Sequence, residues 1–394
     1  MQFVSASVTE QDVTGNVIEE LIASLADKLQ GRSIDLMVVF FSPHYALVAV
    51  DFQARLRGRF QPQVCIGCAA AGVISETHEY EYAPAIAVLC AILPDVQMTG
   101  FALPYADWPD ALANESFIQN GLDVVEPPKL FILLADPLST PMEDVLGVFE
   151  RCYPGVPIVG GMATATQPNG EQALLLDGEV HTRGVVGLAL GGALAVDVVV
   201  SQGCRPFGMP YIVSAAQRNL IMSLEDRSPM LCLQEAMASL PRIDPERIQN
   251  GLHVGRVVQQ LGEFAQPGDF IIRGVMGVHQ ESDVIAIGDY VQVGDVIQFH
   301  LRDAEIAAAE LDMLLVPQQF APPPAGALLF TCVGRGQNLY EEPDKDLSIV
   351  QAALGHVPLI GFFALSALGP VGDHAYLHAQ TLVAVIFRQL ADEL

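Results

Sequence analysis

The residues best suited to chemistry form a short run late in the chain, Cys332-Val333-Gly334-Arg335-Gly336, directly after an apolar stretch. The two glycines allow positive φ angles and close approach to the backbone, and the N–H groups of such a turn can hold an anion. Arg335 can bind a carboxylate through two parallel hydrogen bonds. The run therefore predicts an anion-binding turn, with a structural salt bridge of Arg335 as the alternative.

Cys332 allows a second interpretation, as the nucleophile of a thiol-dependent enzyme. A catalytic cysteine needs a base within hydrogen-bond reach, and the sequence offers His356, His374 and His378. Packing or pocket lining is the simpler interpretation, because a free cysteine behaves as a small hydrophobic residue. The chain is therefore interpreted as a binding protein, with the thiol enzyme as an alternative.

A second cysteine–arginine pair, Cys204-Arg205, lies in a segment rich in glycine and proline that is expected to connect two domains. Ligands frequently bind between domains. The pair is therefore a candidate for lining a pocket, and simple anchoring of the connecting loop is the alternative.

No metal or cofactor site is predicted. Cys65 and Cys68 form a C-x-x-C motif, but no second pair follows at the spacing of a zinc site. His374 and His378 are four residues apart on an expected strand, where the two side chains lie too far apart to share a metal. The Gly334-Arg335-Gly336 turn lacks the third glycine of a dinucleotide fingerprint.

Three stretches share one plan, in which an apolar run, an amphipathic stretch and a glycine-containing apolar run follow one another, at 34–72, 130–163 and 327–364. Each has about the length of a strand–helix–strand crossover. In open α/β sheets, ligands sit beyond the carboxyl ends of the strands, and glycine there permits close approach. We therefore expect the glycines of the second runs to line a ligand crevice: Gly67, Gly160, Gly161 and Gly361.

The predicted fold class is α/β with two domains, at residues 1–220 and 221–394. Quasi-repeated strand–helix–strand units are expected to form mixed sheets that antiparallel meanders extend. Hydrophobic periodicity predicts helices at 13–29 and 142–152, and Ser228-Pro229 is typical of the start of another helix.

Two dipeptides typical of turns predict hairpins in the first half. Pro94-Asp95 separates apolar runs at 85–93 and 96–103, and Gly191-Gly192 interrupts a long apolar stretch. The two runs that flank each turn are expected to pair with each other.

Composition excludes several classes of partner. The 394 residues carry 19 Lys and Arg against 46 Asp and Glu, a net charge of −27. Nucleic-acid binding requires a basic surface, and an acidic protein is repelled by anionic membranes, so neither partner is expected. Seven scattered cysteines and the lack of a signal peptide favour the reducing cytoplasm.

The order of these motifs resembles the FIST domain family over most of the chain, from about residue 30 to residue 385. The second half carries a C-x-G-R-G turn at Cys332, a GFF strand at Gly361 and a GPVG turn at Gly369. The first half is similar to the FIST N region at the following motifs: Ile66-Gly67-Cys68, Gly160-Gly161-Met162-Ala163 and Gln202-Gly203-Cys204-Arg205-Pro206. One departure is Ser366-Ala367-Leu368, where the family usually carries Gly-Glu-Ile before the GPVG turn.

The resemblance implies an intracellular sensory protein that binds a small molecule, such as an amino acid or a small carboxylate. Ala367 replaces an acidic residue that would pair with a ligand amine, so the departure bears on the class of ligand. The family is often fused to signalling output regions, and this chain carries none, so a separate signalling partner protein is expected. Because some members bind haem, a haem-binding gas sensor is a further alternative.

Overall fold

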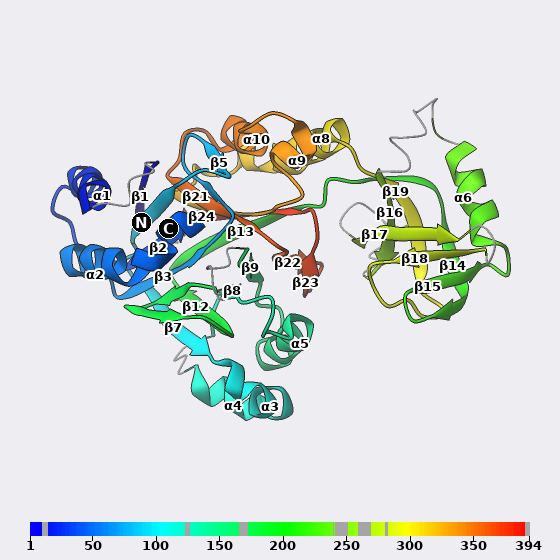
Figure 1. Ribbon diagram of the computed structural model, residues 1–394, viewed down its shortest axis with the longest axis horizontal. Coiled ribbons are helices and arrows are strands. Elements are labelled where there is room, and N and C mark those ends of the chain that lie inside the picture. Colours follow the sequence, from blue (N-terminus) through cyan, green and yellow to red (C-terminus); the bar gives the residue numbers. More distant parts are fainter. Residues whose placement is uncertain are drawn as a thin grey trace. The chain divides into compact units, whose positions relative to one another are not determined.

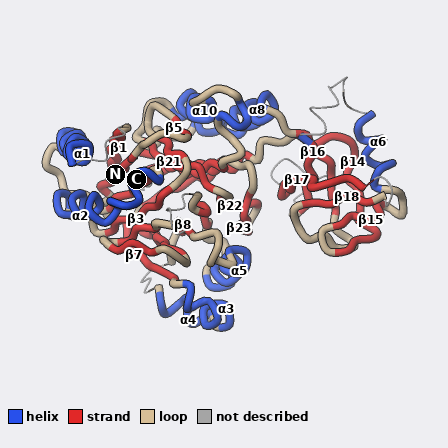
Figure 2. The backbone as a smooth tube through the Cα atoms, viewed as in Figure 1, coloured by secondary structure: helices blue, strands red, loops and turns tan. Residues whose placement is uncertain are grey.

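The computed structural model describes residues 1–9, 15–122, 127–164, 172–238, 240, 251–258, 269–279 and 283–390. The chain forms two compact units (Figures 1 and 2). One combines Met1–Val200 with Leu314–Leu394 and is called the sheet unit; the other, Ser201–Met313, is called the barrel unit. The domain boundary predicted between residues 220 and 221 stays a prediction.

The sheet unit contains three six-stranded sheets. The first has the order β1 (Gln2–Val8), β6 (Ile86–Ile92), β2 (Leu36–Phe41), β3 (Val64–Ala69), β10 (Leu174–Leu176) and β11 (Glu179–His181). The second has the order β23 (His374–His378), β22 (Ala367–Val371), β9 (Ile158–Met162), β8 (Leu130–Ala135), β12 (Val185–Gly192) and β7 (Val96–Leu103). The third has the order β13 (Leu194–Ser201), β24 (Leu382–Gln389), β20 (Gly326–Cys332), β21 (Leu359–Ala364), β4 (Gly72–Ile74) and β5 (Glu79–Glu81).

Each sheet contains one of the three predicted crossover units, and the α/β fold class is confirmed. Strands β2 and β3, β8 and β9, and β20 and β21 are parallel pairs. In all three pairs a glycine of the second strand lies opposite the first strand at an equivalent position: Val39 opposite Gly67, Leu133 opposite Gly160 and Leu329 opposite Gly361. The quasi-repeat in the sequence is therefore a repeat in strand register.

The strands are apolar at every position because successive side chains point to opposite faces of a sheet, and both faces are covered. In β2, Leu36, Val38 and Phe40 enter a core shared by all three sheets, whereas Met37, Val39 and Phe41 pack against helices. A strand covered on both faces needs apolar residues at every position. The helices and turns of this unit are α1 (Gly15–Leu29), η1 (Pro43–Val48), α2 (Ala49–Phe60), η2 (Tyr105–Asp107), α3 (Trp108–Ala113), α4 (Glu115–Gly121), α5 (Met142–Cys152), η3 (Val316–Phe320), α9 (Gln337–Tyr340) and α10 (Lys345–Leu354).

The barrel unit is a closed antiparallel barrel, which the sequence analysis did not predict (Figure 2). Its strands follow the order β14 (Arg205–Gln217), β15 (Leu220–Leu224), β18 (Val284–Ile287), β17 (Phe270–His279), β16 (Leu252–Val257) and β19 (Val296–Leu301). Helix α6 (Pro229–Ala238) begins at the predicted Ser228-Pro229. Helix α8 (Ala304–Leu315) crosses the boundary between the units.

Both predicted hairpin pairings are wrong, although their strands exist. Strand β6 lies between β1 and β2 and has no free edge, so β7 pairs with β12 of another sheet. After Gly192, whose φ is +78°, the chain leaves β12 and enters β13 of the third sheet. The helix predicted at 13–29 is α1, and residues 10–14 lie outside the described residues.

The described helices include none that is both long and apolar enough to cross a lipid bilayer. Over the same residues, no three His, Cys, Asp or Glu side chains are grouped as metal ligands would be. All seven cysteines are free.

Candidate functional site

Arg335 is buried at the carboxyl end of β20, where it holds together the turn that follows. Its guanidinium is fully buried and donates from Nε and Nη2 to the two carboxylate oxygens of Asp346, each at 2.7 Å. Nη2 also donates to the hydroxyl of Tyr340 at 2.8 Å, and that hydroxyl donates to Asp346. The two-pronged geometry expected for a ligand carboxylate is thus formed with Asp346 of α10, the structural alternative considered for this residue.

Two glutamates of β5 lie close to this ion pair. Glu79, which is 5% exposed, accepts a hydrogen bond from the Leu347 N–H at Oε1, while no described residue donates to its Oε2. Burial, together with the negative charge of Asp346, raises the pKa of Glu79 to about 8. Two residues further along the same face of β5, Glu81 accepts from the Gln337 N–H at 2.8 Å.

Glu79 is expected to make the stability of the protein depend on pH. Its pKa rises from 4.5 to about 8 on folding, so between these values the unfolded chain loses a proton that the folded chain keeps. Stability should therefore fall as the pH rises from 5 to 8, by at most about 1.4 kcal/mol for each pH unit. Urea denaturation across this range should show that Glu79→Gln flattens the dependence and stabilises the protein at pH 8.

Glu20→Gln, which changes an exposed glutamate of α1, is the matched control and should leave the pH dependence as it is in the natural protein. An unchanged slope in Glu79→Gln would show that the buried carboxyl ionises as readily in the folded chain as in the unfolded one.

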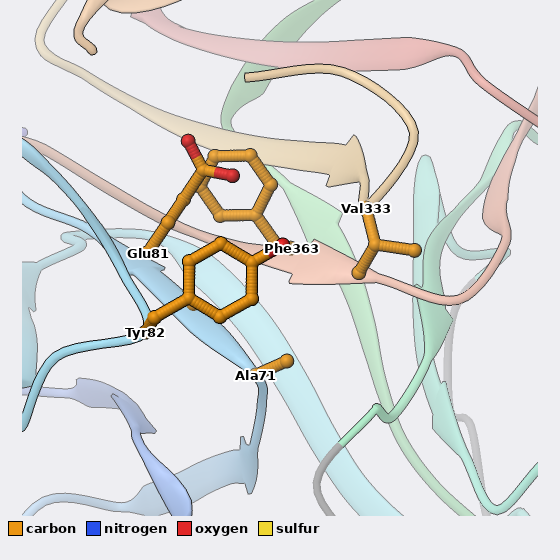
Figure 3. A pocket seen from close by; sticks show the side chains of 6 residues that line it. Ala71, Glu81, Tyr82, Val333 and Phe363 are labelled. Carbon is orange, nitrogen blue, oxygen red and sulfur yellow. The ribbon is translucent and has the colours of Figure 1, made fainter. Parts of the chain in front are cut away.

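A small pocket opens where β3 and β20 end, beside β21 (Figure 3). It has a volume of about 20 Å³, enough for about one water molecule. Figure 3 shows the carboxylate of Glu81 and the rings of Tyr82 and Phe363 gathered around it. The pocket is lined by Ala71, Gly72, Glu81, Tyr82, Val333 and Phe363.

The charged group of the pocket is a carboxylate. Burial raises the pKa of Glu81, and the nearby Asp346 and Asp344 act in the same direction. Gly336, with φ of +56°, lies directly against this carboxylate, since a Cβ there would be 2.4 Å from Glu81 Oε1. The positive φ favours glycine at this position, and the turn packs directly against Glu81.

The glycines expected to line a crevice are packed inside the sheets. A Cβ added to Gly67, Gly160 or Gly361 would lie 1.9, 2.0 and 2.3 Å from the carbonyl oxygen of the opposing strand. A Cβ added to Gly161 would lie 2.8 Å from the Ala364 side chain, and one added to Gly334 would lie 3.1 Å from the Gln380 side chain. Ligand contact by these residues stays a prediction, and in this structure their role is close packing.

The two candidate cysteines are also buried. Cys332 donates to the carbonyl oxygen of His378 at 3.4 Å, and burial raises the pKa of its thiol, which disfavours the thiolate that a nucleophile needs. Cys204 packs against Phe270 and Ile272 in the barrel unit. Arg205 is exposed and begins the barrel strand β14, so the pair leads into a strand rather than forming a loop.

Two family matches cover nearly the whole chain. The FIST N domain matches residues 35–227, and the FIST C domain matches residues 230–370. The chain belongs to the FIST family. An uncharacterized protein of Mycobacterium tuberculosis is 36% identical over 372 residues, which are 93% of this chain and 95% of the relative. An uncharacterized protein of Mycobacterium bovis is 33% identical over 374 residues, with 93% and 94% covered.

FIST domains suggest a sensory or ligand-binding role. The segment of the FIST N match that carries β4 and β5 lines the pocket together with Val333 and Phe363 of the FIST C match. Ala367, of the Ser366-Ala367-Leu368 segment singled out in the sequence, is fully buried opposite Gly161 in the shared core.

Sequence reasoning missed Glu79, Glu81 and Tyr82. These residues follow an alternating polar and aromatic pattern, and two acids spaced two apart lie on one face of a strand. That pattern was a usable signal of an acidic strand face. The sequence could not show that these glutamates lie near Asp346, because Asp346 is more than 260 residues away in the chain.

Proposed function

We propose that this FIST protein is a non-enzymatic sensor that binds a small amine-bearing ligand, such as an amino acid, at the pocket beside Glu81. The observation that carries the proposal is that the FIST N and FIST C segments both line this pocket, within a single compact unit. A ligand there contacts both parts of the family pattern, which suits a protein that must convert occupancy into a change of shape.

The chemistry of the lining supports an amine rather than an isolated carboxylate. The guanidinium of Arg335 already binds Asp346, whereas the carboxylate of Glu81 borders the pocket. A carboxylate attracts an ammonium group, and aromatic rings stabilise a cation placed over them. We assign Arg335 the role of a positioning residue, which fixes the turn from Gly334 to Gly336 through its buried salt bridge.

Access to the pocket depends on Tyr82. Its side chain is 71% exposed, its φ is +58°, and its hydroxyl contacts only the side chain of Asn338 among the described residues. The volume of about 20 Å³ accepts an ammonium group but not a whole amino acid. We infer that the ligand displaces Tyr82 and that this movement exposes or covers the surface read by a separate signalling partner.

The proposal predicts that amines stabilise the protein and that Glu81 is required. Thermal shift with three sets of compounds (amino acids, amines without a carboxylate, and carboxylates without an amine) should show stabilisation by the first two sets. A ligand at 100 times its dissociation constant adds about 2.7 kcal/mol of stability. Glu81→Gln should abolish the shift, and binding should strengthen as the pH rises through the raised pKa of Glu81.

Glu341→Gln, at an exposed position just after α9, is the matched control and should bind as the natural chain does. Stabilisation by carboxylates alone, or an equal shift in Glu81→Gln and the natural chain, would contradict an amine at this pocket. Native mass spectrometry of freshly purified protein would then identify what the chain carries.

A further inference from the structure

A second and larger cavity lies between the ends of α1 and α2, away from the pocket beside Glu81. It has a volume of about 320 Å³, within the range of small-molecule pockets. It is lined by Ala26, Leu29, Gly31, Arg32, Ser33, Arg59, Phe60 and Gln61. Both helices are followed by residues with positive φ, Gln30 (+52°) and Gly31 (+79°) after α1 and Gln61 (+48°) after α2, so the two chain reversals form its walls.

The charge of this cavity is opposite to that of the protein. The whole chain has a net charge of −27, yet both charged side chains that line the cavity are arginines, Arg32 and Arg59. Other arginines of α2 are neutralised, Arg55 by Glu19 and Arg57 by Asp177. No described carboxylate forms a salt bridge with Arg32 or Arg59. Two uncompensated guanidinium groups therefore face one cavity.

The remaining lining defines which anion would fit. Arg32 donates hydrogen bonds to the carbonyl oxygens of Leu29 and Lys28 and to the side chain of Gln2. A guanidinium group has five N–H donors, so some of them are available to a ligand. The guanidinium carbon of Arg59 lies 5.4 Å from the centre of the Phe60 ring. Ser33 adds a hydroxyl donor. Two guanidinium groups and a hydroxyl suit an oxyanion with several acceptor oxygens.

We propose that the cavity between α1 and α2 is a binding site for a small multivalent oxyanion, carrying carboxylate or phosphate groups, held by Arg32 and Arg59. The site is separate from the proposed amine pocket and does not depend on it. The competing explanation is structural, because basic side chains at helix C-termini also stabilise the helices themselves.

The test is thermal shift and calorimetric titration of the full chain with inorganic phosphate, pyrophosphate and citrate, against sodium chloride at matched ionic strength. The expected result is saturable stabilisation by at least one oxyanion and none by chloride. Phosphate and citrate distinguish the two kinds of acidic group. Arg59→Gln and Arg32→Gln should each weaken binding by about tenfold or more, since hydrogen bonds to charged groups are worth about 1.5–3 kcal/mol.

Arg151→Gln is the matched control, because it removes the same charge from a side chain that is 55% exposed and lies outside the cavity. It should bind oxyanions as the natural chain does. A purely structural role predicts that Arg59→Gln lowers the melting temperature without ligand and leaves the oxyanion-dependent shift intact. That result, or no shift with any of the three oxyanions, would overturn the proposal.

Discussion

Replacing Arg335 by methionine is expected to destabilise the sheet unit by about 3–5 kcal/mol, because the change leaves the carboxylate of Asp346 buried without its cation. Both side chains are fully buried, and the pair makes two hydrogen bonds of 2.7 Å. The fluorescence-detected urea midpoint of the variant and the natural chain measures the loss. Asp346→Asn should be destabilising for the reciprocal reason.

The double variant Arg335→Met with Asp346→Leu is the informative comparison. Replacing both members of a buried ion pair with apolar residues of similar volume is often neutral, so the double variant should recover most of the stability lost in either single variant. A loss below about 1 kcal/mol in Arg335→Met, the size typical of an exposed pair, would contradict the assignment of this arginine as the buried anchor of the turn.

Gly361→Ala is expected to cost about 3 kcal/mol, at the upper end of the usual range for overpacking, or to prevent folding, because overpacking of a tight interior forces the backbone to move. A Cβ at this position would lie 2.3 Å from the carbonyl oxygen of Leu329 on the neighbouring parallel strand. Gly67→Ala should behave alike, since its Cβ would lie 1.9 Å from the carbonyl oxygen of Val39. The soluble yield and the urea midpoint of each variant measure the effect.

Gly58→Ala provides the matched control in the same unit. Gly58 lies within α2, and a Cβ there meets no neighbouring atom. Alanine in a helix is favoured over glycine by about 0.5–1 kcal/mol, so this variant should be slightly more stable than the natural chain. Tolerance of Gly361→Ala at the level of Gly58→Ala would mean that the parallel strands can separate to admit a methyl group.

The three crossover units could be predicted from sequence because their signals are local. An apolar run, an amphipathic helix and a second apolar run occupy about 30 residues, and α5 at Met142–Cys152 has the predicted bounds. The hairpins could not be predicted, since a turn such as Pro94-Asp95 indicates only a reversal. Which strand lies beside β7 depends on the free edges left by the rest of the fold.

The candidate site was also predicted only in part, because the sequence shows local signals but not which distant segments lie together. Arg335 and its flanking glycines stood out by type and spacing, and the salt bridge was one of the two interpretations considered. Its partner Asp346 lies eleven positions along the chain in α10, where nothing in the sequence marks it as buried. Glu79 and Glu81 come from the other family match, so their approach to this turn depends on sheet order, which propensity and periodicity do not reveal.

The third sheet affects whether the FIST N and FIST C regions can be exchanged separately between relatives. Its strands β4 and β5 come from the N-terminal part of the chain, and they extend a sheet whose strands β20, β21 and β24 come from the C-terminal part, with β21 pairing directly with β4. A recombinant that joined the beginning of one relative to the end of another would have to preserve the pairing of β4 with β21. Exchanging the FIST N or the FIST C region alone is therefore expected to disrupt this sheet.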